Sequence, residues 1–299
     1  AAAALHGEDA GAPGPRFGFE YRGSTQGFAA HPGLGLRQAV TGVENALAAT
    51  GEPGLLIRYA GLAHGTVGAV STKTYVDPEP KGQKGTSYFE VIASPTLYAT
   101  QLIHANVKTL ATENPSLRFF IDYYDESGGL AVLHSGVFSL AEGNNELTWR
   151  VPDTNGYPIY RVGLELQSRR RLDGAVVLRS LDWRGAPARF RLRRSFEMSP
   201  ALTPWTTVTP WTSAFVSSAQ NFAPDYTTTF SISHPEANGV VTIGTRDWQD
   251  YAVASLITFS HSRAAGLVAR SRGHRRYYAG ILSEGRAAIV KRRDGTTSV

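Results

Sequence analysis

The last hundred or so residues of this chain are built from short β-type runs, with no helical pattern between them. The runs are GTRDWQDYAVASLITF, AGLVARSRGHRRYYAGIL and AAIVKRRDG, and glycines or charged clusters mark each reversal. Similar runs bounded by Gly, Pro, Asn, Asp or Ser follow one another between residues 17 and 184. The 31 Gly, 13 Tyr and 13 Phe favour turns and pleated surfaces over long helices. This pattern predicts an all-β fold of the β-sandwich type.

The spacing of the runs predicts two jelly-roll-like β-sandwich units in tandem. Residues 1–15 read as a linker or tail, residues 16–192 as the first sandwich and residues 193–299 as the second. The boundary is placed where arginines give way to a proline-containing stretch. The second unit is shorter than sandwiches of this kind usually are, so we expect it to be incomplete.

Composition removes several classes of function. The chain has no cysteine, which excludes disulfides, thiolate metal sites and cysteine nucleophiles. It has no apolar run long enough to span a membrane and no secretory signal pattern at its start, and the compartment stays unknown. The net charge of +5 raises nucleic acid as a partner. Because the arginines concentrate at turns and linkers, solvated charge is the better interpretation and nucleic acid is not favoured.

The alternation of side chains along the strands of the first unit predicts a carbohydrate-binding surface. In SLRFFIDYYD the residues Leu117, Phe119 and Ile121 point to the core, which leaves the intervening residues on the other face. If three such strands are neighbours, their polar faces form one surface with rings to stack on sugars and polar groups to bind hydroxyls. The residues of this surface are Tyr98, His104, Asp122, Tyr124, Glu165 and Gln167. The alternative is an ordinary solvated sheet face.

Catalysis has weaker support in the residues. Asp122 with Asp125, or Glu165 with Asp182, are conceivable carboxylate pairs for a glycan-acting hydrolase or lyase. Nothing in the sequence marks two of these carboxylates as sharing a pocket. The chain has no phosphate-binding loop, no nucleophile elbow and no histidines at metal-ligand spacing.

A structural calcium ion is the one cofactor that the sequence suggests. Glu20 and Asp182 stand at opposite ends of the first unit, and sandwiches often pair their first and last strands. A hard cation held by these carboxylates and by loop carbonyls would join the two ends. The alternative is that Asp182 ends a strand and faces water.

In the second unit, Arg270 and Tyr278 with the adjacent Tyr277 form a candidate cation and aromatic surface for a glycan. The alternative is an arginine packed over tyrosine rings without a ligand. The run that begins at Tyr251 is apolar on both sides and predicts an internal strand.

Several phrases of the sequence resemble known families. FEYRGSTQGF and GAVVLRSLDW resemble a carbohydrate-binding module of the galactose-binding-like type. YFEVIASPTLYATQ, LTWRVPDTNGYPIYRVGLEL and LRSLDWRGAP, followed by GTRDWQDYAV and IVKRRDG, resemble the region after the catalytic domain in certain ADP-ribosylglycohydrolase family proteins. The resemblance implies an accessory region with a concanavalin-like or laminin-G-like second unit and a missing N-terminal catalytic domain, and it carries over no catalytic residues.

These observations together predict non-catalytic binding of carbohydrate or glycoconjugate beside an enzyme domain. A glycan-acting hydrolase or lyase with its site on the first sandwich is the first alternative, and a structural spacer is the second.

Overall fold

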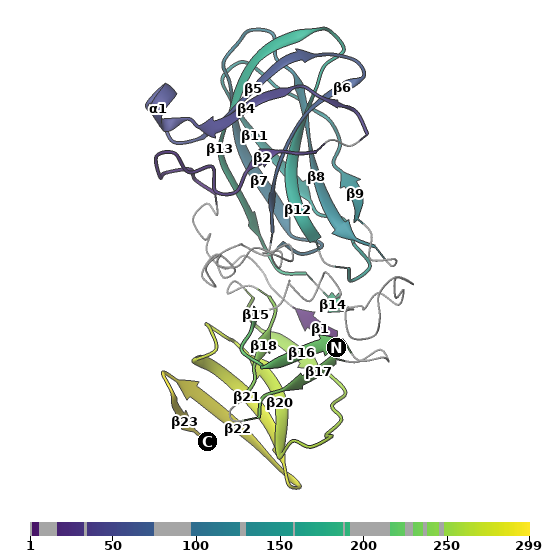
Figure 1. The fold of residues 1–299 in the computed structure, drawn as a ribbon, viewed down its shortest axis with the longest axis vertical. Helices are drawn as coiled ribbons and strands as arrows, with labels where there is room; N and C mark the ends of the chain where they lie inside the picture. The colour runs from purple at the N-terminus through teal and green to yellow at the C-terminus, as the bar shows by residue number, and fades with distance from the viewer. Residues whose placement is uncertain are drawn as a thin grey trace.

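The structure is a computed structural model, and it is built almost entirely of β-strands (Figure 1). It describes residues 2–5, 17–32, 35–74, 97–125, 130–157, 159–187, 189–191, 216–224, 230–235, 238–244 and 248–299. Within these ranges the one helix is the single turn α1 (Leu47–Thr50). The all-β prediction is therefore confirmed.

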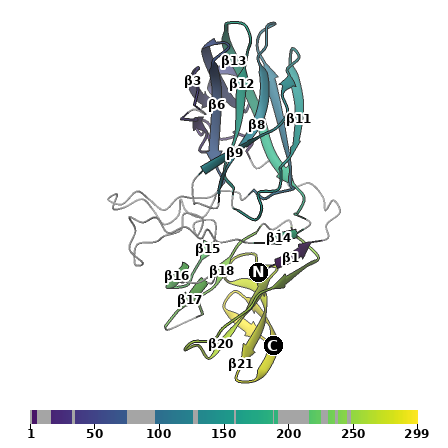
Figure 2. The ribbon, with the colours of Figure 1, turned by 90° about the vertical axis from the view of Figure 1, so that its right-hand side faces the viewer.

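The first sandwich consists of two sheets that face each other (Figure 2). The seven-stranded sheet has the order β10 (Phe138–Ser139), β8 (Ser116–Tyr124), β12 (Ile159–Gln167), β6 (Thr66–Lys73) and β2 (Ala29–Ala30), with β9 (Leu130–His134) beside β8 and β3 (Arg37–Gln38) beside β6. The five-stranded sheet has the order β11 (Asn144–Arg150), β7 (Leu102–Thr109), β13 (Leu172–Arg184), β5 (Leu55–Leu62) and β4 (Val40–Asn45). Only the short β3–β6 pair is parallel among these pairs.

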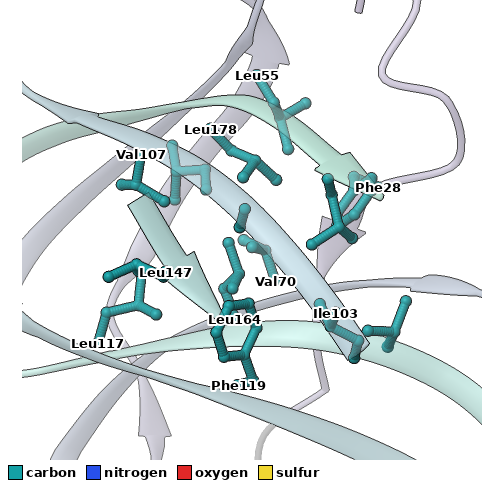
Figure 3. Packing of buried hydrophobic residues seen from close by; sticks show 14 of the residues in the cluster. Phe28, Leu55, Val70, Ile103, Val107, Leu117, Phe119, Leu147, Leu164 and Leu178 are labelled. Atoms are coloured by element: carbon teal, nitrogen blue, oxygen red, sulfur yellow. The ribbon is translucent and has the colours of Figure 1, made fainter. Parts of the chain in front are cut away.

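The core of the sandwich lies between the two sheets and follows the two-residue period of the strands. Figure 3 shows side chains from both sheets packed together, with Val107 and Leu178 from one sheet and Phe119 and Leu164 from the other. Trp183 is completely buried in the same cluster. Burial of one such large apolar side chain stabilises the fold by roughly 1.5–3 kcal/mol, so this core fixes which face of each strand points outward.

The two ends of the first sandwich pair with each other, as expected of its first and last strands. Phe17 forms an isolated antiparallel bridge with Leu181, with backbone hydrogen bonds of 3.0 Å in both directions. The loop after Phe17 is held by Asn45, whose amide group donates to the backbone carbonyls of Phe19, Tyr21 and Ser24. Backbone and amide hydrogen bonds thus fix the entry to the sandwich against its body.

The N-terminal strand β1 (Ala2–Leu5) lies in the middle of a three-stranded antiparallel sheet, between β14 (Arg189–Arg191) and β19 (Tyr251–Ala254). Residues expected to belong to a linker or tail therefore join the end of the first unit to the second, and Figure 1 shows β1 beside the C-terminal strands. The strand β19 ends at Ala254 and lies at the edge of this sheet. The prediction of an internal strand there is wrong, because Leu256 and Phe259 after it are exposed.

The rest of the second unit is antiparallel. Two short ladders join β15 (Val216–Ser217) with β18 (Val241–Thr242) and β16 (Asn221–Pro224) with β17 (Phe230–Ser233). The largest element is a four-stranded sheet in the order β20 (Ala264–Ala269), β21 (Arg276–Ser283), β22 (Arg286–Arg293) and β23 (Thr296–Ser298). One face of this sheet carries a small core around Tyr277, Ala279 and Val240. The other face is exposed and carries Tyr278 and Ile289.

Candidate functional site

Polar and aromatic side chains gather on the outer face of the seven-stranded sheet, along β8 and β12. The register places Asp122 opposite Arg161, Phe120 opposite Gly163, and Arg118 opposite Glu165. These residues alternate with the inward-pointing core residues of the same strands. The outer face therefore carries two carboxylates with an aromatic ring between them.

Asp122 is the centre of the first polar cluster. Its side chain is buried, with 4% of its surface exposed, and its Oδ2 lies 3.0 Å from Nε2 of His31 and 3.8 Å from Nη1 of Arg161. Its second oxygen, Oδ1, is buried and accepts no hydrogen bond from the residues that the structure describes. A buried carboxylate oxygen without a donor is costly, and Asp122 therefore lies beneath the groups of this face that solvent can reach.

Glu165 is the centre of the second cluster and is completely buried. Nη2 of Arg118 donates to both of its oxygens, at 2.8 and 3.0 Å. Nε2 of His134 lies 3.1 Å from Oε2, and the amide of Gln167 donates to Oε1 at 2.5 Å. A carboxylate bound on several sides fixes its partners in one geometry, because each of them would lose a charge-assisted hydrogen bond by moving.

Phe120 fills the space between the two clusters. Its ring is completely buried and contacts His31 edge-on, with ring centroids 5.0 Å apart, and His134 at 6.2 Å. The ring lies over Gly163, where a Cβ would come within 2.4 Å of the Phe120 ring and 2.5 Å of the Val70 carbonyl oxygen. A glycine is required here because only a residue without a side chain lets the ring lie against the sheet.

The protonation of His134 follows from this environment. Burial, together with the nearby Arg118 guanidinium, lowers the pKa of His134 below its ordinary value of 6.5, and Glu165 opposes the shift only in part. The imidazole is then neutral at pH 7. A neutral ring that donates one N–H to Glu165 keeps its other nitrogen as a hydrogen-bond acceptor.

The groups that solvent can reach on this face are the partners of the two carboxylates. The side chains of Arg118 and His134 are each 26% exposed, and that of Arg161 is 22% exposed. The Arg161 guanidinium lies over the ring of Tyr160, 4.7 Å from its centroid. A ligand on this face would therefore meet guanidinium, imidazole and amide groups, while the carboxylates beneath would hold those groups in place.

The structure brings together three of the six residues predicted for the carbohydrate surface. Asp122, Glu165 and Gln167 share the outer face of β8 and β12. Tyr98 instead lies buried before β7, where its hydroxyl accepts a hydrogen bond of 2.7 Å from the Gly244 backbone and its ring contacts Trp248. The side chain of Tyr124 lies outside the described residues.

His104, the remaining residue of the predicted surface, lies on β7 in the five-stranded sheet. There its Nε2 is 2.7 Å from Oε2 of Glu146 and its Nδ1 is 3.6 Å from Oδ2 of Asp182. Consecutive strands β7 and β8 belong to opposite sheets, which the alternation within each strand does not reveal. The same division places Glu165 and Asp182 on opposite outer faces, so the carboxylate pair proposed from these two residues does not form.

The residues proposed for calcium do not fit that ion. Glu20 is exposed, whereas Asp182 is buried, and its oxygens face Arg184 at 3.3 Å and His104 at 3.6 Å. The neighbours of the carboxylate are thus a guanidinium and an imidazole, whereas a hard cation prefers several oxygen ligands. No group of three or more His, Asp or Glu residues suited to a metal ion occurs in the part of the chain that the structure describes.

The two residues proposed in the second unit are near each other in the sheet but do not form one contact. Tyr278 on β21 is 43% exposed, and the cation over its ring is Lys291, at 5.8 Å from the centroid. Arg270 follows β20 in a turn with a positive φ of 51°, and its backbone N–H donates to the Tyr251 hydroxyl. Tyr277 is buried on the opposite face.

Several residues that the structure places in the site have no assignment from the sequence. Arg118 and Phe120 could have been found, because they alternate with the core residues of the same strand as Asp122. His31 and His134 come from other parts of the chain and reach the site through β2 and β9. No local pattern in the sequence marks them.

No family model matches this chain, and no curated protein is similar to it. Several solved structures have some likeness to this chain. One comes from a study of the promiscuous specificity of carbohydrate-binding modules from the β-sandwich superfamily. It has 13% sequence identity and a TM-score of 0.38, and the match covers 57% of this chain and 62% of that one. The xylan-binding CBM22-1 domain of Paenibacillus barcinonensis Xyn10C has 16% identity and a TM-score of 0.36, covering 59% of this chain and 97% of the domain.

A third likeness is the family 11 carbohydrate-binding module of the cellulosomal cellulase Lic26A-Cel5E of Clostridium thermocellum, with 14% identity and a TM-score of 0.38, covering 60% of this chain and 97% of the module. At these identities and TM-scores no ligand or activity is carried over to this chain. Among the described residues no helix has the length and apolarity needed to cross a bilayer.

Proposed function

We propose that this chain binds carbohydrate, without turning it over, on the outer face of β8 and β12. One observation carries the proposal: two buried carboxylates on this face, Asp122 and Glu165, hold a set of arginine, histidine and amide groups in fixed positions. Sugar recognition needs polar groups that are oriented before the ligand arrives, because ordering flexible side chains lowers affinity.

The chemistry of the face suits hydroxyl groups, which both donate and accept. Arg118 and Gln167 are donors, and the side chain of Arg118 is 26% exposed. His134, whose side chain is also 26% exposed, offers its second ring nitrogen as an acceptor. Paired donors and acceptors of this kind are what a saccharide hydroxyl requires.

The same geometry disfavours hydrolysis by these two carboxylates. Asp122 lies four residues along β8 from Arg118, which is the partner of Glu165 across the sheet. At roughly 3.3 Å per strand residue the backbones of the two residues are about 13 Å apart along the strands, and the buried Phe120 ring lies between their side chains. Glycosidase carboxylate pairs are about 5–9.5 Å apart and share an open site, whereas Asp122 and Glu165 are buried on either side of an aromatic ring, which disfavours both mechanisms.

Calorimetric titration with a panel of neutral and acidic oligosaccharides tests the proposal. Gln167→Ala removes one ligand-facing amide, and Asn106→Ala is the matched control, since Asn106 is an amide hydrogen-bonded to Glu146 on the opposite sheet. We expect Gln167→Ala to weaken binding by about tenfold and Asn106→Ala to leave it unchanged. Equal effects of the two variants, or no saccharide bound at all, would refute the proposal.

A reducing-end assay on the same oligosaccharides separates the alternatives. Product formation that is lost in Asp122→Asn would favour the hydrolase or lyase, and the absence of both binding and turnover would favour the structural spacer. The association with an ADP-ribosylglycohydrolase catalytic domain rests on the sequence resemblance alone and stays a prediction.

A further inference from the structure

The positive charge of this protein is concentrated in its last 36 residues. Residues 264–299 contain eight Arg and Lys residues and two acidic residues, Glu284 and Asp294, for a net charge of +6. Since the whole chain has a net charge of +5, the preceding 263 residues together carry −1. The excess charge therefore belongs to the β20–β23 sheet, all of which the structure describes.

The fold gathers seven of these cations at one end of the sheet. The turn between β20 and β21 and the turn between β22 and β23 meet there, with the Asp294 N–H donating to the Arg275 carbonyl at 2.9 Å. We call this region the basic end. It consists of Arg270, Arg272, Arg275, Arg276, Lys291, Arg292 and Arg293, of which all but Arg292 are exposed.

Asp294 is the one carboxylate at the basic end, and it forms a salt bridge with the side chain of a single arginine. Nε and Nη2 of Arg276 bind its two oxygens at 2.9 and 3.0 Å. Arg293 lies directly across from Arg276 in the register, and like charges in that position destabilise a sheet. His274 adds no charge at pH 7, because burial lowers its pKa. The basic end thus carries an unneutralised charge that the fold itself does not need.

We propose that the basic end binds an anionic polysaccharide through its carboxylate or sulfate groups. Guanidinium groups pair with such anions by two parallel hydrogen bonds, and neighbouring strands about 4.8 Å apart present them as an array. The exposed Tyr278 with Lys291 beside its ring offers one apolar surface for a sugar ring next to this array. This surface is separate from the face of β8 and β12 and does not depend on the function proposed for it.

The architecture favours a polysaccharide over nucleic acid. Single-stranded nucleic acid sites stack successive bases on several aromatic rings, and Tyr278 is the one exposed ring among residues 264–299. Duplex DNA is read by an element that enters a groove. The exposed face of β21 and β22 carries Ile289, with 75% of its surface exposed, beside the cations, and such an apolar side chain suits the face of a sugar ring better than a phosphate backbone.

Fluorescence titration of the full chain with heparin oligosaccharides, polygalacturonate, neutral dextran and a 20-base-pair duplex tests this proposal. Arg272→Ala/Arg275→Ala/Arg293→Ala removes three exposed cations that are not the side-chain partners of Asp294. Arg169→Ala/Arg170→Ala/Arg171→Ala removes the same charge from an exposed run between β12 and β13 and is the matched control.

We expect the triple variant at the basic end to weaken binding to heparin or polygalacturonate by about tenfold or more, and the control variant by less than about twofold. Dextran should not bind at this surface. Equal losses in the two variants, dextran binding as tight as that of the acidic chains, or tighter binding of the duplex than of either polysaccharide at about 0.15 M salt would each overturn the proposal. Because all six residues are exposed, both variants should fold, and their circular dichroism checks this. If Gln167→Ala abolished saccharide binding on the face of β8 and β12, the comparison of these two triple variants would be unaffected.

Discussion

Replacing Gly163 with alanine should destabilise the first sandwich, although alanine is usually the better residue in a strand. A glycine in the middle of a strand costs about 0.5–1 kcal/mol relative to alanine, so an open site would gain that amount. At Gly163 the added Cβ would lie 2.4 Å from the Phe120 ring and 2.5 Å from the Val70 carbonyl oxygen. The ring could rotate away, but the carbonyl belongs to the neighbouring strand β6 and can move only with it.

Overpacking of this kind costs about 1–3 kcal/mol. Because one obstacle is backbone, we take the upper end and subtract the alanine gain, which leaves a net loss of about 2 kcal/mol in the free energy of unfolding. Urea unfolding followed by tryptophan fluorescence measures this loss, since Trp183 is buried in the same core. The control is Gly136→Ala, where the added Cβ would meet nothing within 4 Å and the glycine has no positive φ.

The reasoning fails if Gly163→Ala is as stable as the parent protein or more stable. The double variant Gly163→Ala/Phe120→Ala tests how much of the destabilisation comes from the clash with the Phe120 ring. The cost of Gly163→Ala should be smaller in that background, because two of the three nearest atoms to the added Cβ belong to the Phe120 ring, while the Val70 oxygen remains.

Three further changes test the polar structure. Glu165→Gln should lower the free energy of unfolding by about 3 kcal/mol, because it leaves Arg118 without its counterion. The control Glu146→Gln lies on the exposed face of the other sheet and should cost less than about 1 kcal/mol. Equal costs of the two variants in urea unfolding would contradict this. Because the folded protein holds the pKa of His134 below 6.5, the unfolded chain binds more protons than the folded protein just below that pH. The free energy of unfolding should therefore fall as the pH drops through 6.5. His134→Gln should reduce this fall. Asn45→Ala should cost about 1–3 kcal/mol by freeing three carbonyls of the residue 19–24 loop, with a larger proteolytic sensitivity of that loop as the second readout.

The sequence predicts those features that depend on neighbouring residues alone. The two-residue alternation places Leu117, Phe119 and Ile121 in the core, and all three are buried there. The same rule gives the inward face of β12 at Val162 and Leu164. Alternation works because one face of each of these strands packs into the apolar core between the sheets, and a shift by one residue would move the whole apolar set out of it.

The arrangement of strands depends on contacts far apart in the chain, which no local pattern contains. β7 and β8 are consecutive, yet they lie in different sheets, so His104 and Asp122 face opposite sides of the sandwich. The apolar residues after Tyr251 predict a buried strand, but Leu256 is fully exposed. His31 meets Asp122 over a separation of 91 residues, and only the fold brings the two together.

The two proposed surfaces should respond differently to salt, because the protein uses charge in opposite ways on them. On the face of β8 and β12 the carboxylates are buried and already paired with arginines, so a ligand meets fixed hydrogen-bonding groups at short range. At the basic end six cations are exposed and only Asp294 opposes them, so attraction acts over a Debye length of about 8–10 Å. We expect binding of an acidic polysaccharide to weaken steeply between about 0.05 and 0.2 M salt in the parent protein and less steeply in the triple variant, whereas binding of a neutral sugar at Gln167 should change little. Equal salt dependence at both surfaces would mean that the exposed arginines do not carry the attraction.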